Sequence, residues 1–280
     1  MKQDKFGEIC KDIKSLKIQG AENIARAALR ALLLRHDQES VRKLISLRPT
    51  EPCLRNCIKH ALSFPEVKDG VSKTLKIMDD SRKKIRVMGS RLIKNDSIVF
   101  THCHSSTVIS ILLEAKRQGK RFQVYNTETR PNFQGRKTAL ELIKAGIPVT
   151  MFIDSAASSA LRHADLFLFG VDAITTRSII NKVGNKTMAE IAQRYDTPSY
   201  ACSFSWKFDS KTALGDMERL EKRDEKEVWF EKPKNLKIDN VVFDEIPFSL
   251  VTGIISELGV LEPAMFTNEL QRHYPKVFNI

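Results

Sequence analysis

The pattern of hydrophobic and polar positions changes near residue 96 of the 280-residue chain. Before that point apolar residues recur at helical spacing, and Leu32, Leu33 and Leu34 should face a core. Pro49 and Pro52 bracket a turn, after which a new helix can begin. The pattern therefore predicts helices over residues 21–34, 54–62 and 71–85.

Beyond residue 96, short β-branched and aromatic runs alternate with segments of helical length. The predicted strands cover residues 97–103, 121–127, 148–153, 166–170 and 199–204. The predicted helices cover residues 107–117, 136–145, 155–162 and 188–195. Such repetition gives a parallel sheet with right-handed crossovers and helices on both faces. We therefore expect an N-terminal helical domain over residues 1–95 and a Rossmann-like, doubly wound α/β domain over residues 96–280.

The last part of the chain is less regular. Residues 207–234 carry eight positive and eight negative side chains, and the stretch up to Lys237 should be a long surface excursion with some helix. Residues 248–258 are amphipathic and should pack back on the sheet.

Composition and charge narrow the function classes. The net charge is +12, and residues 1–86 hold 20 Lys/Arg against 11 Asp/Glu. A basic region suits nucleic acid, an anionic small molecule, an acidic partner or plain solvation, but no nucleic-acid motif accompanies it. No apolar run reaches the roughly 20 residues of a membrane span, and the N-terminus has no signal-peptide pattern. The five scattered cysteines lack a C-x-x-C pair, which predicts free thiols in the cytoplasm; Cys53 and Cys57 should share a buried helix face.

Candidate chemistry gathers where the predicted strands end. In open α/β sheets, ligands bind beyond the carboxyl ends of the strands. The polar groups there are Thr101–Ser106, Thr127–Arg130, Asp154-Ser155 and Gly170–Asp172. We therefore expect a binding or active site at this edge of the sheet.

Two of these residues could carry proton chemistry. Cys103 precedes a Ser105-Ser106 turn that opens a helix, and the helix N-terminus would lower the pKa of its thiol, giving a base or nucleophile. The alternative is a small buried residue. Asp172 could be held protonated by burial and act as a general acid, or it could cap the next helix. Asp154 is the better candidate for a helix cap, since it directly precedes a helical run.

The neighbouring polar residues have weaker signals. His102 and His104 should pack or form hydrogen bonds rather than hold a metal, since no second ligand group has recognisable spacing. Lys182 with Gly184 could hold a phosphate through its ammonium and exposed backbone N–H groups, and Gly20-Ala21 before a helical run could do likewise.

With these residues in view, the chain resembles one superfamily from about residue 18 to 260. This superfamily contains the archaeal-type ribose-1,5-bisphosphate isomerases, the methylthioribose-1-phosphate isomerases and the regulatory subunits of translation initiation factor 2B. The matching segments are Ile18–Ala21, Arg48–Thr50, Leu54–Asn56, Thr101–Cys103, Glu128–Pro131, Gln134-Gly135, Asp154–Ala156, Gly170–Asp172, Asn181–Gly184, Trp206–Phe208 and Glu257–Val260.

The resemblance implies roles for residues already named. Cys103 and Asp172 match the cysteine and aspartate that carry the proton chemistry of the isomerases. The positions that match holders of sugar and phosphate are Gly20, Ala21, Arg48, Gln134, Asn181 and Lys182. We add Ser105, Arg130 and Lys207 as further binding candidates. The resemblance implies no metal and no organic cofactor, and it implies a homo-oligomer, either a dimer or a trimer of dimers.

The resemblance leaves two functions to separate. One is an enzyme that makes ribulose-1,5-bisphosphate from ribose-1,5-bisphosphate in AMP and nucleotide salvage. The other is a non-catalytic regulatory subunit that binds initiation factor 2 or sugar phosphates. Regulatory subunits typically lack the cysteine and aspartate, so their presence favours the enzyme. Gln19 stands where methylthioribose enzymes carry arginine, which argues against that substrate, and Asn185 stands in place of a usual threonine.

Overall fold

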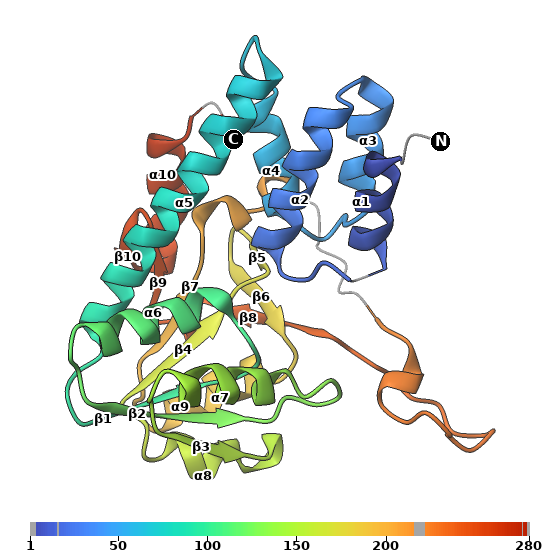
Figure 1. Cartoon of the computed structure of the whole chain (residues 1–280). Coiled ribbons are helices and arrows are strands. Elements are labelled where there is room, and N and C mark those ends of the chain that lie inside the picture. Colours follow the sequence, from blue (N-terminus) through green and yellow to red (C-terminus); the bar gives the residue numbers. More distant parts are fainter. Residues whose placement is uncertain (1–3, 16, 216–221, 276, 279–280) are drawn as a thin grey trace.

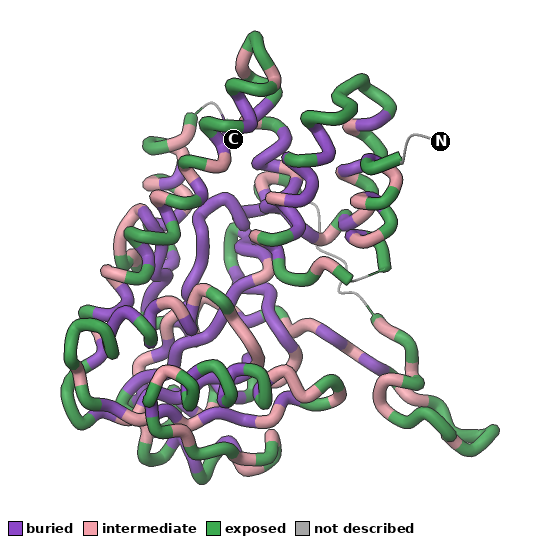
Figure 2. Tube along the Cα trace, in the orientation of Figure 1, coloured by how far each residue is buried: buried purple, intermediate pink, exposed green. Residues whose placement is uncertain are grey.

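The first part of the chain is helical, as its pattern predicts (Figure 1). In this computed structural model, residues 4–15, 17–215, 222–275 and 277–278 are described. The first five helices are α1 (Lys5–Lys14), α2 (Ala21–Leu34), α3 (Gln38–Ser46), α4 (Pro52–Ala61) and α5 (Val67–Leu92). Helices α2 and α4 pack on each other through their apolar faces, and Cys53 and Cys57 on α4 are fully buried, as expected. Figure 2 shows buried and exposed residues following one another along these helices. Leu32 is buried as predicted, but the prediction was wrong for Leu33 and Leu34 at the end of α2, which are 45% and 49% exposed.

A seven-stranded sheet forms the second part, and the predicted α/β fold class is confirmed. Its order is β10-β9-β7-β4-β1-β2-β3, and only the β9–β10 pair is antiparallel. The strands are β1 (Ser97–Thr101), β2 (Phe122–Thr127), β3 (Val149–Phe152), β4 (Leu166–Gly170), β7 (Ser199–Cys202), β9 (Gly253–Ser256) and β10 (Gly259–Leu261). Strands β2 and β3 follow β1 on one side of the sheet, and β4, β7 and β9 follow it on the other. The order therefore reverses between β1 and β4, which is the topological switch point.

The β1–β4 pair is locked by aromatic packing. Phe100 and Phe167 are register partners, both fully buried, with ring centroids 5.2 Å apart at an interplanar angle of 65°. Such an edge-to-face pair is worth about 0.5–1.5 kcal/mol beyond its buried area. This packing fixes the two strand ends, after Thr101 and after Gly170, next to each other.

Helices cover the sheet and join it to the helical part. They are α6 (Ser106–Arg117), α7 (Gln134–Lys144), α8 (Ala157–Leu161), α9 (Asn185–Arg194) and α10 (Pro263–His273). Short 3₁₀ helices are η1 (Asp154–Ala156), η2 (Ser205–Lys207), η3 (Ser210–Leu214), η4 (Glu225–Glu227) and η5 (Phe248–Leu250). The long helix α5 packs along α6 and against β9, so the helical part rests directly on the sheet (Figure 1).

The pattern did not predict a second, three-stranded sheet. It consists of β5 (Ala173–Ile174), β6 (Ser178–Lys182) and β8 (Phe243–Pro247), paired antiparallel. Strand β5 is too short to show a period, and β8 comes from a distant part of the chain. The amphipathic segment 248–258 does pack on the sheet domain, but largely as strand β9 of the main sheet. Part of the charged excursion, residues 216–221, lies outside the described residues.

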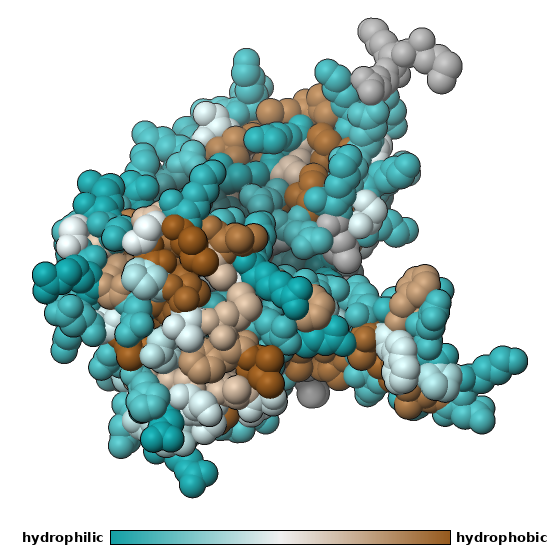
Figure 3. All heavy atoms as spheres, turned by 60° about the horizontal axis from the view of Figure 1, so that its bottom comes forward, coloured by the Kyte–Doolittle hydropathy of each residue, from teal (hydrophilic) through white to brown (hydrophobic). Residues whose placement is uncertain are grey.

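Hydrophobic side chains remain exposed on the sheet's edge. Leu140 and Ile143 on α7 and Met151 on the edge strand β3 are 70%, 57% and 40% exposed, and Ile153 follows them at 58%. In Figure 3, where the bottom of the Figure 1 view is turned toward the reader, hydrophobic residues gather on the surface. Among the described residues no helix is long and apolar enough to cross a membrane.

Candidate active site

A cavity of about 240 Å³ opens beyond the carboxyl ends of β1 and β4, between the sheet and the helical part. Ten of the predicted site residues line it: Gly20, Ala21, Arg48, Cys103, Ser105, Gln134, Asp172, Asn181, Lys182 and Lys207. Arg130 does not line it, because its guanidinium donates to the carbonyl of Val228 at 3.0 Å. The fold therefore brings together residues that are far apart in the sequence, as a switch-point site requires.

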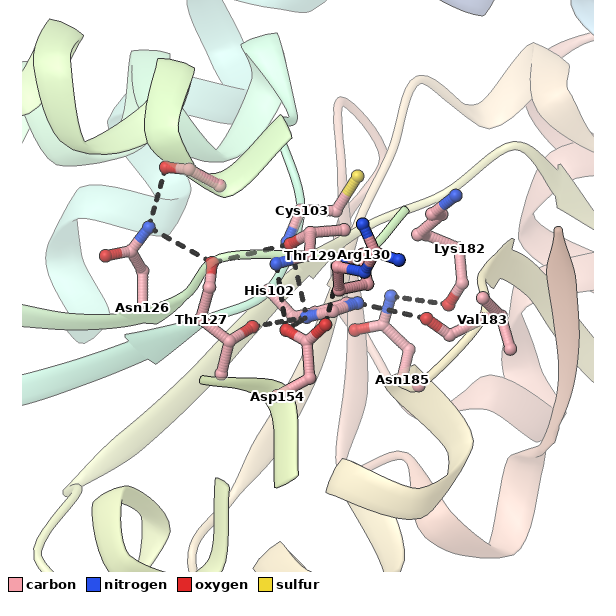
Figure 4. A network of polar contacts seen from close by, with 12 residues as sticks. His102, Cys103, Asn126, Thr127, Thr129, Arg130, Asp154, Lys182, Val183 and Asn185 are labelled. Atoms are coloured by element: carbon pink, nitrogen blue, oxygen red, sulfur yellow. Dashed lines mark hydrogen bonds and ion pairs between the residues drawn. The ribbon is translucent and has the colours of Figure 1, made fainter. Parts of the chain in front are cut away.

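The backbone of Cys103 is held in an unusual conformation. Its φ of 67° lies in the left-handed region, which non-glycine residues rarely adopt. Two hydrogen bonds hold it there: its N–H donates to Thr129 Oγ1 at 2.9 Å, and its carbonyl accepts from Thr138 Oγ1 at 2.8 Å. In Figure 4 the thiol points away from the polar network below it. The strained turn thus directs the sulfur out of the loop.

His102 anchors this turn from beneath, as the hydrogen-bonding prediction for it requires. Its Nε2–H donates to the carbonyl of Val183 at 3.0 Å, and Nδ1 faces the hydroxyl of Thr127 (Figure 4). Burial lowers the pKa of His102 to about 4, so the ring is neutral at physiological pH and Nδ1 accepts. Gly184 permits the approach, because its φ is 103° and a Cβ there would lie 3.2 Å from His102 Nε2.

Asp154 has another task than the predicted helix cap. Its carboxylate accepts from the backbone N–H groups of Thr129 and Arg130 at 2.8 and 2.7 Å, and it makes no cap bond to the short helix it opens. The prediction was wrong because the loop after β2 competes successfully for the same carboxylate. The result is a fixed 129–130 loop that supports the Cys103 backbone through Thr129 (Figure 4).

Asp172 is oriented by two asparagines. Asn181 Nδ2 donates to Asp172 Oδ2 at 2.9 Å, and Asn185 Nδ2 donates to Asn181 Oδ1 at 2.7 Å. Strand β5 follows Asp172, so the alternative of a helix cap is wrong. Burial raises the pKa of Asp172, although Lys207 and the Asn181 bond oppose the shift. The shift has the direction that a general acid needs.

The thiol of Cys103 does not behave as its sequence position suggested. Desolvation by the surrounding protein raises the pKa of the part-exposed Cys103 thiol to about 11, against the smaller lowering effects of the His104 N–H and the Lys182 charge. The prediction of a lowered pKa was wrong because desolvation outweighs these two effects. In the free protein the group is a thiol at neutral pH.

This state of Cys103 is directly measurable. In the native protein an alkylating reagent should modify Cys103 alone, because Cys10, Cys53, Cys57 and Cys202 are buried. The rate should rise about tenfold per pH unit from about pH 7 to 10, since only the thiolate reacts. Mass spectrometry of the alkylated peptides gives site and rate, with denatured protein as the control in which all five react. A rate independent of pH above about 7 would contradict the raised pKa.

Basic side chains line the cavity. Lys207 is buried and donates to the carbonyl of Val171 at 2.6 Å, and the ammonium of Lys182 lines the wall. Burial lowers the pKa of Lys182, an effect that the nearby Cys103 opposes. The expectation of an exposed N–H at Gly184 beside it was wrong, since that N–H donates to the Asp244 carboxylate at 2.7 Å. An anion would therefore meet the ammonium of Lys182 but not the Gly184 backbone.

Two long helices point their N-termini at the cavity. Helix α2 begins after Gly20 and α7 begins at Gln134, and neither has a side-chain cap bond. In α2 the first backbone N–H groups lack intrahelical partners and favour anions. In α7 the N–H groups of Gly135 and Arg136 already donate to the carbonyls of Glu128 and Phe133, at 3.2 and 3.0 Å. Ser105 instead caps its own helix, accepting from Val108 N at 3.4 Å, and its side chain packs on Gly170. A Cβ at position 170 would lie 2.8 Å from Ser105 Oγ, so this close approach requires glycine.

Sequence reasoning missed two buried residues of the site. Glu51 lines the cavity with 4% of its surface exposed and pairs with Arg48 at 3.3 Å. Asn185 is fully buried behind Asn181. Glu51 could have been noticed as a charged residue directly after the matched Arg48–Thr50 segment. Asn185 could have been noticed because it replaces the usual threonine.

Fold and cavity together define an α/β protein with a polar cavity at the switch point of its sheet. The family model described as the initiation factor 2 subunit family matches residues 17–263, and the chain belongs to this family.

Relatives in this family differ in their names. The chain is similar to the ribose 1,5-bisphosphate isomerase of Methanocaldococcus jannaschii, with 33% identity over 284 residues covering 93% of this chain and 92% of that one. It is similar to a putative translation initiation factor eIF-2B subunit 2-like protein of Pyrococcus furiosus, at 27% identity covering 94% and 98%. The crystal structure of the Pyrococcus horikoshii translation initiation factor eIF-2B superposes with a TM-score of 0.82, at 28% identity covering 93% and 98%.

Proposed function

We propose that this protein is an aldose–ketose isomerase that converts ribose-1,5-bisphosphate into ribulose-1,5-bisphosphate, a reaction of AMP and nucleotide salvage. The observation that carries the proposal is the pairing of Cys103 and Asp172 in one cavity, after the adjacent strands β1 and β4. An unreactive binding protein has no need of both groups. The relative named ribose 1,5-bisphosphate isomerase supports the choice of substrate.

The chemistry requires an acid and a base. A sugar phosphorylated at carbon 1 has a closed ring and cannot isomerise until the ring oxygen leaves. Asp172, whose pKa is raised by burial, protonates that oxygen, while the thiolate of Cys103 removes the proton from carbon 2 and returns it to carbon 1. Asn181 holds one oxygen of Asp172, which leaves the other oxygen to carry the acidic proton.

The lining suits a doubly phosphorylated sugar. Lys182, Lys207 and the uncapped N-terminus of α2 offer positive charge and N–H donors to phosphate groups. The buried Oε2 of Glu51 has no hydrogen-bond partner among the described residues, and a sugar hydroxyl would satisfy it. Arg48 and the other basic groups then neutralise the two phosphates.

Turnover is the test. Purified protein incubated with ribose-1,5-bisphosphate should accumulate ribulose-1,5-bisphosphate, followed by ³¹P NMR or by a coupled carboxylase, whereas ribose 5-phosphate should not react because it lacks the phosphate on carbon 1. Absence of turnover by a folded preparation that still binds the bisphosphate would contradict the enzyme. Stoichiometric capture of purified initiation factor 2 by such an inactive preparation would instead support a regulatory subunit.

A further inference from the structure

Glu51 is a buried carboxylate that lines the cavity at the start of α4. It stands at the N-cap of α4, where a carboxylate normally accepts from the helix N–H groups, yet it makes no such bond. Its side chain lines the cavity instead, with 4% of its surface exposed. Burying a carboxylate is costly, so this orientation calls for a use inside the cavity.

The contacts of Glu51 leave one oxygen for a ligand. Oε1 accepts from Arg48 Nη2 at 3.3 Å, and Oε2 is buried without a hydrogen-bond partner among the described residues. The charged groups around the carboxylate are Arg48 from the preceding loop, Asp172 from the end of β4 and Lys207 from η2. Glu51 thus shares its surroundings with the acid of the proposed reaction.

The protons of the proposed isomerisation do not balance on Cys103 and Asp172 alone. Cys103 takes the proton from carbon 2 and returns it to carbon 1, so it ends in the protonation state in which it began. Asp172 gives its proton to the ring oxygen, which becomes a hydroxyl. The carbon-2 hydroxyl must then lose its proton as the C2=O bond forms, and Asp172 must regain one. A second base that faces both the sugar and Asp172 closes this cycle.

We propose, resting on the isomerase function above, that Glu51 is a further catalytic residue: its Oε2 accepts the proton of the substrate hydroxyl that becomes the ketone, and returns it to Asp172. The transferred proton moves first from the carbon-2 oxygen to Glu51 and then from Glu51 to the Asp172 carboxylate. The sum of the steps is the isomerisation, with all three side chains restored.

The electrostatics support this role. Burial raises the pKa of Glu51 to about 7, together with the charge that Asp172 carries once it has given up its proton, against the lowering effect of Arg48 and Lys207. A base with such a pKa is ionised often enough at neutral pH and still holds a proton well during transfer. An ordinary exposed glutamate would be a weaker acceptor by two to three orders of magnitude.

The substitution Glu51→Gln separates this role from simple binding. The amide keeps the size of the side chain and an oxygen for Arg48, but it cannot take up the proton. We expect kcat to fall about 100-fold or more, while the dissociation constant of ribulose-1,5-bisphosphate, measured by calorimetry, changes less than about threefold. The matched control is Glu114→Gln, which alters an equally buried, Arg117-bound carboxylate outside the cavity and should leave kcat unchanged.

The pH profile is the second readout. In the wild type the slope of log kcat against pH should steepen below about pH 7 as Glu51 becomes protonated, and in Glu51→Gln this steepening should be absent. A variant with kcat within about threefold of wild type, or one that loses only affinity, would overturn the role of Glu51 and leave the isomerase intact. A wild type without turnover would overturn the isomerase, and this proposal with it.

Discussion

Replacing Asp172 with Asn should lower kcat about 10³-fold while the protein stays folded and still binds the sugar bisphosphate. The amide has nearly the same shape and can turn its oxygen toward Asn181 Nδ2, so the 2.9 Å hydrogen bond survives. It cannot give a proton to the ring oxygen, and the loss of a positioned general acid costs roughly 10²- to 10⁴-fold. Steady-state kinetics together with calorimetric binding of ribulose-1,5-bisphosphate separate the two effects.

A buried aspartate elsewhere provides the control. Asp209 is 1% exposed and accepts from Arg55 at 2.7 Å, but it does not line the cavity. Asp209→Asn should lower the free energy of unfolding, because Arg55 loses its anionic partner, and leave kcat of the folded protein near wild type. Equal losses of kcat in both variants would mean that the effect of Asp172→Asn is structural.

Replacing Cys103 with Ser should abolish measurable turnover to a similar extent, about 10³-fold or more. A hydroxyl is a far weaker acid than a thiol and supplies almost no alkoxide at any workable pH. The backbone bonds of residue 103 to Thr129 and Thr138 involve main-chain atoms, so the turn itself should persist. Product formation by ³¹P NMR over long incubations measures the residual rate.

The pH dependence of wild-type turnover also tests Cys103 as the base. Because the pKa of Cys103 is about 11, its thiolate fraction should rise about tenfold per pH unit above about pH 7. The rate should follow this rise as long as Asp172 keeps its proton. Cys10→Ala, a change in the helical part, should keep both rate and profile. A Cys103→Ser variant with the rate and pH profile of the wild type would contradict Cys103 as the base.

Much of the fold was predictable because its helices and strands follow from the pattern of hydrophobic and polar residues close together in the chain. The alternating strands and helices after residue 96 identify themselves through β-branched runs and helical periods, and all five predicted strands are present within a few residues. Cys103 and Asp172 were found for the same reason, since a polar residue directly after an apolar strand marks its carboxyl end. The small sheet of β5, β6 and β8 escaped because antiparallel partners far apart in the chain leave no local signal.

The errors at the site also have a common cause, which is competition between partners. Asp154 binds the 129–130 loop instead of its own helix, and the Gly184 N–H binds Asp244 instead of facing the cavity. The folded geometry decides which carboxylate accepts a hydrogen bond from each backbone N–H group. Arg130 similarly turns to the carbonyl of Val228, which belongs to a segment nearly a hundred positions later.

By itself, the sequence determined the element types, the chemistry at each strand end and the positive charge available for an anionic ligand, because these depend on neighbours along the chain. Only the tertiary structure decided that β1 lies beside β4, which brings Cys103 and Asp172 to one cavity. It also decided the protonation states, because desolvation depends on everything packed around a group. Desolvation raises the pKa of the Cys103 thiol, where the sequence predicted a lowered one. The fold also places Glu51, which the sequence analysis did not single out, in the lining of the cavity.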